Sequence, residues 1–297
     1  MTAQLDAGTT GEGDATAPAG TTRRRRSARG PRAGMPIRRG AGVTLGLVTL
    51  WLTLLVLLPL IAVVGKAFDD GWSGFWSAIT NPSAATALRL TVGLSLIVAI
   101  VGAVMGTVVA WVLVREPFRG SRLLDLVIDI PFALPTIVAG IVMLAVYGSG
   151  GVGPDLFGTR LGLFVTLLFV TLPFTVRTVQ PVLLDLDRDA EQAAASLGAS
   201  PAVVFRRIVL PQLRPALASG AALAFARALG EYGSLVFISS NLANTKVASA
   251  LIYGKYQDAE NPLALQQGAA ISTVLLLASA IVLVLLDLVQ RRAARRG

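Results

Sequence analysis

Arg227 and Glu231 are two opposite charges that lie four residues apart inside an apolar run. On a helix this spacing puts both side chains on one face, where they can form an ion pair. Counted from Pro215 at about 1.5 Å per residue, Arg227 lies about 18 Å along such a helix, near the centre of a bilayer. Charges at that depth are costly, so they pair or face a cavity. Two interpretations stay open: these residues, with Tyr232 and Ser234, form part of a translocation path or gate, or the pair only locks two helices together.

The residue types that are missing exclude much of the usual catalytic chemistry. The chain contains neither cysteine nor histidine, which removes disulfides, thiol nucleophiles, imidazole bases and His/Cys metal sites. It also lacks the G-x-x-x-x-G-K-[ST] phosphate loop, so it cannot supply an ATPase site by itself. Carboxylate chemistry remains possible in principle, but an intramembrane enzyme would have no evident catalytic group. We therefore expect no catalytic residue, no metal and no cofactor.

The elements that must position the charged pair are membrane spans. Of the 297 residues, 54% are hydrophobic and only 14% are charged, and the mean hydropathy is +0.69. A soluble domain of this length could not bury so much apolar surface. Because backbone groups in lipid must be satisfied within their own segment, long apolar runs predict helices. The sequence thus predicts an all-α integral membrane protein with a transmembrane domain over 43–290 and six spans, at 43–65, 88–114, 123–147, 161–184, 215–239 and 268–290.

The distribution of basic residues predicts the orientation of these spans. Most of the 26 Lys and Arg residues lie in the N-terminal tail, the 115–122 turn, the 185–214 loop and the tail at 291–297. Cytoplasmic segments carry this excess, so both termini and the 185–214 loop are predicted to be cytoplasmic in a bacterial inner membrane protein. Arg177, near the cytoplasmic end of the fourth span, is expected to snorkel toward the interface.

The N-terminal tail, 1–42, is a separate region. Residues 1–20 contain almost no large apolar group and are expected to be disordered. The arginines at 23–26 could bind nucleic acid, but beside a span they favour a role in topology and contact with anionic lipid. The first span is too long for the core of a signal peptide, so we expect it to be retained.

The loop at 185–214 has the local signals of two short helices joined by a turn. The alanine-rich run 189–197 favours a helix, and Gly198 permits the conformation that ends it sharply. The Ser200–Pro201 pair suits the N-cap and first position of a second helix. The prolines at 211 and 215 are expected to break the chain before the fifth span. Helix–Gly–helix turns are common, so these signals alone do not separate a docking loop from one that packs under its own bundle.

Part of this loop resembles the EAA loop of ABC-importer permeases, in which EAA is followed by three residues, Gly, nine residues and I-x-L-P. The matching residues are Ala193, Ala194, Gly198, Ile208, Leu210 and Pro211. The resemblance implies that the loop docks into a separate ATPase subunit. The glutamate of the family falls at Gln192, whereas Glu191 lies one residue earlier. A carboxylate contact to the ATPase would then come from Glu191 or Asp189, or be replaced by a neutral hydrogen bond.

Three further stretches, at 131–140, 172–181 and 225–234, resemble the sulfate/thiosulfate permease family, with molybdate permeases close behind. The resemblance covers about residues 45–290 and implies the type I ABC importer (MetI-like) permease fold. It also implies a T-type subunit in a heterodimer with a second homologous permease, two ATP-binding subunits and an extracytoplasmic substrate-binding protein, with no nucleic acid. The alternatives are a permease for another oxyanion, such as molybdate, and an ion-coupled secondary transporter, which would need broken helices in repeated halves.

Overall fold

The computed structural model describes residues 39–116, 118–240 and 244–294, and the described part is helical with no strand. Residues 1–38, where disorder and lipid contact are predicted, and 295–297 lie outside it. The chain divides into two units, Met1–Leu52 and Thr53–Gly297. The first unit contributes α1 (Arg39–Leu52), and all other helices belong to the second.

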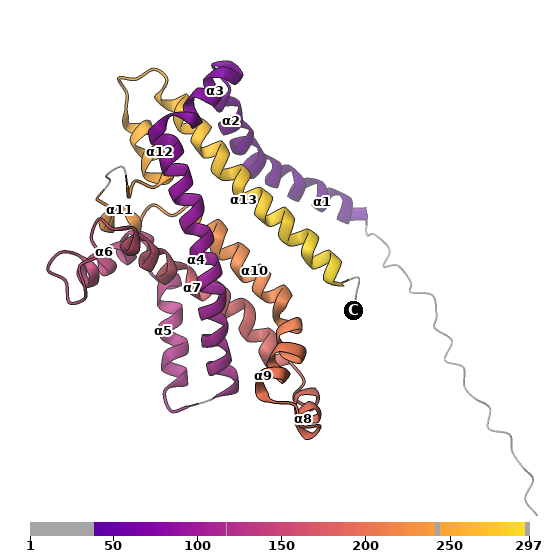
Figure 1. The fold of residues 1–297 in the computed structure, drawn as a ribbon. Coiled ribbons are helices and arrows are strands. Elements are labelled where there is room, and N and C mark those ends of the chain that lie inside the picture. The colour runs from indigo at the N-terminus through magenta and orange to yellow at the C-terminus, as the bar shows by residue number, and fades with distance from the viewer. Residues whose placement is uncertain (1–38, 117, 241–243, 295–297) are drawn as a thin grey trace, which may run out of the picture. The chain divides into compact units, whose positions relative to one another are not determined.

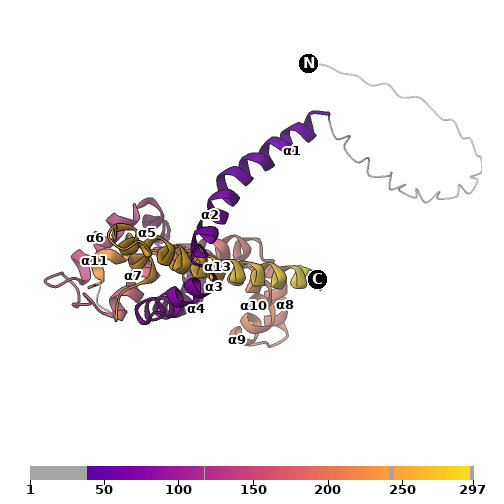
Figure 2. The ribbon, with the colours of Figure 1, turned by 90° about the horizontal axis from the view of Figure 1, so that it is seen from above.

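The second unit is a bundle in which long helices alternate with short ones. In Figure 1, α3 and α12 lie at one end of this unit, which we call the α12 end. The helices α8 and α9 lie at the other end, which we call the α8 end. Seen from above in Figure 2, α6 and α11 lie on one side of the bundle and α8 to α10 on the other. The elements of the unit are the π-helix η1 (Thr53–Leu57), α2 (Leu58–Ala67), α3 (Gly71–Thr80), α4 (Pro82–Arg115), α5 (Ser121–Ala133), α6 (Thr136–Tyr147), α7 (Arg160–Asp185), α8 (Arg188–Ser196), α9 (Pro201–Val204), the π-helix η2 (Phe205–Val209), α10 (Leu210–Leu229), α11 (Leu235–Ile238), α12 (Ala248–Gln257) and α13 (Ala264–Ala294).

The centre of the bundle is formed by α4, α7 and α10, which pack closely because small residues face each other. A Cβ atom on Gly106 of α4 would lie 2.7 Å from Cβ of Thr175, and one on Gly220 of α10 would lie 2.4 Å from Oγ1 of Thr178. Both glycines therefore let the neighbouring backbones approach α7, as is typical of helix contacts in membranes. Buried apolar side chains, among them Val176 of α7 and Leu213 of α10, fill the same interface.

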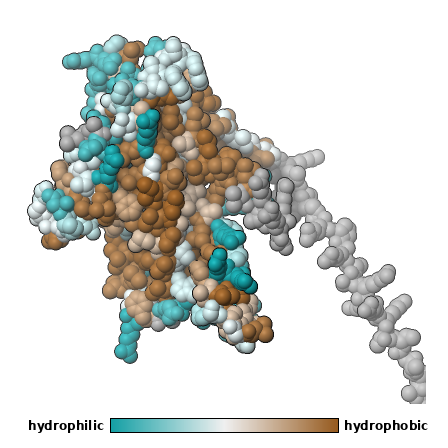
Figure 3. Space-filling view, viewed as in Figure 1, coloured by the Kyte–Doolittle hydropathy of each residue, from teal (hydrophilic) through white to brown (hydrophobic). Residues whose placement is uncertain are grey.

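In the described part of the chain, five helical segments are long and apolar enough to cross a membrane, and there are up to six if the bent pair α5–α6 counts as one span. They are Gly42–Ala67, Pro82–Arg115, Arg160–Asp185, Pro201–Leu229 and Ala264–Leu288. In Figure 3, hydrophobic residues cover the middle of the visible face of the second unit, and hydrophilic residues gather toward its two ends. Apolar side chains on the outside of a bundle and polar groups at its ends are the arrangement expected in a bilayer.

The segment predicted as the third span, 123–147, is sharply bent in the structure. The segment is broken into α5 and α6, whose axes differ by 117°. Leu134 (φ −77°, ψ 133°) and Pro135 (φ −55°, ψ 138°) at the break are extended. The ring of Pro135 disfavours a helical conformation at the preceding residue, and Pro135 has no N–H to continue the hydrogen-bond ladder.

The predicted bounds of the fifth span, 215–239, also differ from the structure. The prolines at 211 and 215 do not break the chain, because a continuous helical segment runs from Pro201 to Leu229. The π-turn η2 pairs the Leu210 N–H with the carbonyl of Phe205, five residues back. The ladder is therefore already shifted where Pro211 lacks an N–H, which lets the helix continue. It ends at Gly230 instead, before a turn and the short helix α11.

Candidate functional site

The loop between α7 and α10 begins with a well-capped helix and a glycine turn. The side chain of Asp187 accepts a hydrogen bond from the N–H of Asp189 (2.9 Å) at the start of α8. At its end, Gly198 adopts φ +83°, which side chains disfavour. The N–H of Gly198 bonds to the carbonyl of Ala195 (2.9 Å), and that of Ala199 to the carbonyl of Ala194 (3.0 Å). This pair of bonds fixes the direction in which the chain leaves α8.

The second helix of the loop is the first part of a long helical segment, Pro201–Leu229, which we call the rod. It begins at Pro201 after an extended Ser200, which makes no side-chain cap bond. From there α9, η2 and α10 form a continuous segment of 29 residues, about 43 Å long at 1.5 Å per residue. One continuous helical segment therefore connects the loop beyond Gly198 to the far end of α10.

The outer surface of α8 carries the family-matching residues and one prominent leucine. Gln192 and Ala193 are exposed, as is Asp189. Leu197 is 89% exposed at the end of α8, although nothing in the motif pointed to it. The remaining predicted loop residues are Ala194, Ile208 and Leu210, which are half-buried, and Gly198 and Pro211, which are exposed.

Glu191 does not face outward, because it pairs with Arg115 at the end of α4. The Arg115 guanidinium donates to Oε1 of Glu191 at 2.6 Å, and the two side chains are 7% and 19% exposed, respectively. Arg115 also lies over the ring of Trp111 (5.8 Å), and Trp111 contacts Phe205 of η2 edge-on at 5.5 Å. The loop is thus tied to α4 at two points. No local pattern in the sequence marks Arg115, because its partner lies 76 residues away.

Arg177 forms ion pairs with α5 in addition to the snorkelling that was expected. Its guanidinium donates to Asp125 (2.9 Å) and Asp129 (2.5 Å) of α5, and to Oε1 of Gln180 (2.7 Å). Two carboxylates four residues apart in an apolar run need a cation nearby. That spacing was a signal in the sequence for this link between α5 and α7.

Arg227 and Glu231 form the ion pair that their spacing predicted. The Glu231 side chain is 2% exposed and that of Arg227 is 31% exposed. Glu231 also holds the chain where α10 stops, since its Oε1 accepts a hydrogen bond from the N–H of Ser234 (2.8 Å). Its backbone carbonyl accepts one from the hydroxyl of Ser249 in α12 (2.7 Å). The Glu231 carboxylate therefore neutralises Arg227 and also caps the chain where the helix α10 ends.

The end of α10 lies beside the middle of α4, which is the longest helix of the described residues. Phe225 and Leu229, near the end of α10, pack against Ala99, which is central in α4. Two further predicted residues surround this helix end. The ring of Tyr232 contacts that of Tyr253 of α12, with centroids 5.0 Å apart and planes tilted by 32°, and Ser234 is buried. The charged pair therefore lies far from both ends of α4.

The described residues contain no group of three or more His, Cys, Asp or Glu side chains that could hold a metal ion. The arrangement provides a physical connection between the surface loop and the buried charged pair. A well-capped surface helix is tied to α4, and a rod leads from the same loop to a buried charged pair.

Comparisons with known proteins agree with this arrangement. The profile of the family described as "Binding-protein-dependent transport system inner membrane component" matches residues 99–296. The sulfate transport system permease protein CysT of Salmonella typhimurium is 39% identical over 266 residues, which cover 86% of this chain and 95% of that protein.

Two solved structures share the fold. A bacterial ABC transporter involved in the import of the acidic polysaccharide alginate has a TM-score of 0.68 at 15% identity, covering 87% of this chain and 97% of its own. The MetNI methionine ABC transporter, in an inward-facing conformation, has a TM-score of 0.53 at 18% identity, covering 70% and 94%. The predicted all-α fold of an ABC-importer permease is confirmed.

Proposed function

The chain belongs to the family of binding-protein-dependent transport system inner membrane components, and on that basis we propose that it is the permease subunit of an ATP-driven sulfate importer. The observation that carries the proposal is the 39% identity to a sulfate transport permease over 95% of that protein's length. The chain itself is a non-enzymatic membrane subunit, so ATP is hydrolysed by its partners. The complete importer would contain two ATP-binding subunits, a second homologous permease and an extracytoplasmic binding protein.

The charge distribution supports an orientation with the α8 end in the cytoplasm. That end carries seven arginines of the second unit: Arg115, Arg119, Arg122, Arg188, Arg206, Arg207 and Arg214. Cytoplasmic ends of spans carry such an excess. Both chain termini would then be cytoplasmic, and the basic N-terminal tail would contact anionic lipid.

In this orientation α8 is the element that docks into the ATPase. Three of its exposed residues, Gln192, Ala193 and Leu197, offer a small apolar surface with one neutral polar group. Glu191 is already paired with Arg115, which favours a neutral contact from Gln192 at the position of the family's glutamate. When the ATP-binding subunits close, they would draw the loops of the two permeases together. The rod that ends at Leu229 would carry this movement to the Arg227–Glu231 pair, the proposed gate.

The proposal is tested by uptake of labelled sulfate in a strain whose chromosomal copy is deleted. We expect the deletion to abolish high-affinity uptake and the intact chain to restore it, with thiosulfate and molybdate added as competitors. Uptake that is unaffected by the deletion would rule out sulfate as the cargo. Strong competition by molybdate alone would point to the other oxyanion.

A Leu197→Ser variant is expected to insert normally and to lose about tenfold in uptake. An exposed leucine contributes nothing to the isolated bundle, whereas a buried anchor at an interface is worth about 1.4 kcal/mol or more, which is tenfold in affinity. The measurement is the amount of ATPase that co-purifies with the tagged permease, together with uptake. Leu184→Ser is the control, because Leu184 is 67% exposed at the end of α7 but lies outside the loop. Wild-type co-purification of Leu197→Ser would exclude this leucine as an anchor.

A further inference from the structure

Three adjoining pockets at the start of α4 are lined by basic side chains that have no carboxylate partner. The first, of about 410 Å³, contains Lys255. The second, of about 290 Å³, shares Ser83 with it and contains Lys246. The third, of about 490 Å³, shares Thr86 with the second and contains Arg89 and Arg160. The pockets follow the first turns of α4 from the α12 end.

Lys66, unlike the four basic residues of the pockets, has a carboxylate partner, so the lack of such partners is a property of the pockets. Lys66, at the same end, forms an ion pair with Asp69 at 2.6 Å. Among the described residues, no Asp or Glu oxygen lies within 4.0 Å of the charged nitrogens of the four pocket residues, since all ion pairs found there involve other cations. Four such cations around one concave region raise the local concentration of anions.

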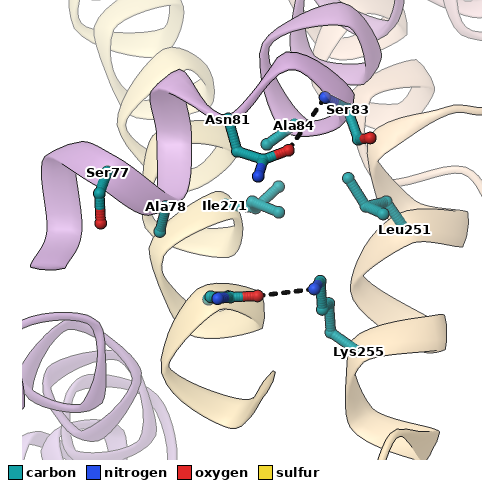
Figure 4. A pocket seen from close by; sticks show the side chains of 9 residues that line it. Ser77, Ala78, Asn81, Ser83, Ala84, Leu251, Lys255 and Ile271 are labelled. Atoms are coloured by element: carbon teal, nitrogen blue, oxygen red, sulfur yellow. Dashed lines mark hydrogen bonds between the residues drawn. The ribbon is translucent and has the colours of Figure 1, made fainter. Parts of the chain in front are cut away.

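The first pocket has the chemistry of an anion site. Figure 4 shows the Lys255 side chain extending from α12 toward α13, beneath Asn81 and Ser83. The ammonium of Lys255 donates one hydrogen bond, to the amide oxygen of Gln267 at 2.6 Å, which leaves two protons for a ligand. The amide oxygen of Asn81 accepts from the N–H of Ser83 (3.1 Å), so the NH₂ group of Asn81 is the part left to bind a ligand. The donors thus carry one positive charge, and no carboxylate lines the pocket.

We propose that this pocket binds a tetrahedral oxyanion through Lys255, Gln267 and Asn81, and that Lys246 extends the site into the neighbouring pocket. A ligand that only accepts hydrogen bonds and carries negative charge satisfies these donors, and charge-assisted bonds to it are the strong ones. Free sulfate and the phosphate of a lipid headgroup share this chemistry. The identification of sulfate as one source rests on the proposed function, under which the α12 end faces the binding protein.

The test uses the complete transporter, purified in dodecyl maltoside without added lipid. Binding of ³⁵S-labelled sulfate is measured by equilibrium dialysis in the absence of the binding protein, and retained phospholipid is measured by native mass spectrometry. We expect Lys255→Gln to weaken sulfate binding at least fivefold and Lys255→Arg to retain it. Lys66→Gln is the matched control, because it removes a lysine that is already neutralised, and should bind as the wild type does.

The two sources of the oxyanion give different results. If the wild type binds no sulfate but retains a phospholipid that Lys255→Gln loses, the site holds a headgroup phosphate. If Lys255→Gln matches Lys66→Gln in both measurements, the pocket is not an oxyanion site. Sulfate uptake by the wild-type transporter distinguishes a failure of the pocket proposal from a failure of the proposed function. If the transporter carries sulfate but shows no Lys255-dependent binding, only the assignment of the pocket as an oxyanion site is overturned. If it carries no sulfate, the assignment of sulfate as the cargo is overturned, and the lipid measurement remains valid.

Discussion

A Glu191→Ala variant is expected to lose most of its ATP-driven uptake, and to lose more than Arg115→Ala does. Removing Glu191 leaves the guanidinium of Arg115, only 7% exposed, without its carboxylate. Breaking a buried pair in this way costs about 3 kcal/mol or more, because an uncompensated charge stays behind. Removing Arg115 instead leaves Glu191, which is 19% exposed at the edge of α8 and closer to water. The asymmetry between the two variants follows from their different burial.

The pair is expected to matter for coupling because it connects the docking helix to the longest helix of the bundle. Without it, α8 can move when the ATPase closes while α4 stays in place. We therefore expect Glu191→Ala to retain basal ATP hydrolysis in proteoliposomes but to lose its stimulation by the loaded binding protein. Arg188→Ala is the control, since Arg188 is an exposed charged residue on the same helix and makes no ion pair among the described residues.

A double-mutant cycle separates the pair from its individual residues. The Arg115→Ala/Glu191→Ala variant removes both charges and should transport better than Glu191→Ala alone. Equal, near-normal uptake and stimulation in Glu191→Ala and Arg188→Ala would show that the contact has no part in coupling.

The second large effect is expected at Glu231, where replacement by alanine should reduce uptake more than tenfold. The variant leaves Arg227 unpaired beside the middle of α4 and removes the acceptor of the Ser234 N–H. A charge without a partner and an unsatisfied backbone group at this depth are both costly. Asp287→Ala is the matched control, because Asp287 pairs with Arg291 at the same spacing of four but is 53% exposed.

The sequence alone predicts that either single alanine variant is worse than the double variant, and the structure refines this expectation. Because Glu231 also accepts from Ser234, the double alanine variant should recover only partly, whereas Arg227→Ala/Glu231→Gln keeps an acceptor and should recover further. Sulfate efflux from loaded vesicles without ATP distinguishes a gate from a structural pair. A gate predicts faster leakage from this neutral variant. Single variants that insert and transport normally would contradict both roles.

Several parts of this architecture were predictable because they depend on neighbours along the chain. The (i, i+4) spacing of Arg227 and Glu231 places them on one helix face in any fold. Gly198 followed by the Ser200–Pro201 pair likewise ends one helix and begins the next through local backbone preferences. The break at Pro135 was also readable in principle, since a proline restricts the residue before it. Hydropathy hid this break, because Leu134 and its neighbours are as apolar as the rest of the run.

The role of Glu191 could not be predicted from its surroundings. The motif suggested a carboxylate that faces a partner subunit, yet the structure turns Glu191 toward Arg115 of its own chain. Similarly, the prolines at 211 and 215 looked like the end of the loop, and the π-turn before them lets the helix continue. The position of Glu191 depends on what α4 presents to the loop, which no local pattern contains.

The sequence by itself determined the membrane-spanning character, the loop elbow and the charged pair, because apolar length, glycine and proline preferences and helical spacing act over a few residues. Only the tertiary structure decided that Glu191 is bound by Arg115, that Arg177 joins α7 to α5, and that four cations without carboxylate partners surround the start of α4. Those contacts join residues far apart in the chain, and each depends on how separate helices pack. The physical reason is that burial and charge compensation are settled between helices, whereas helix formation is settled within them.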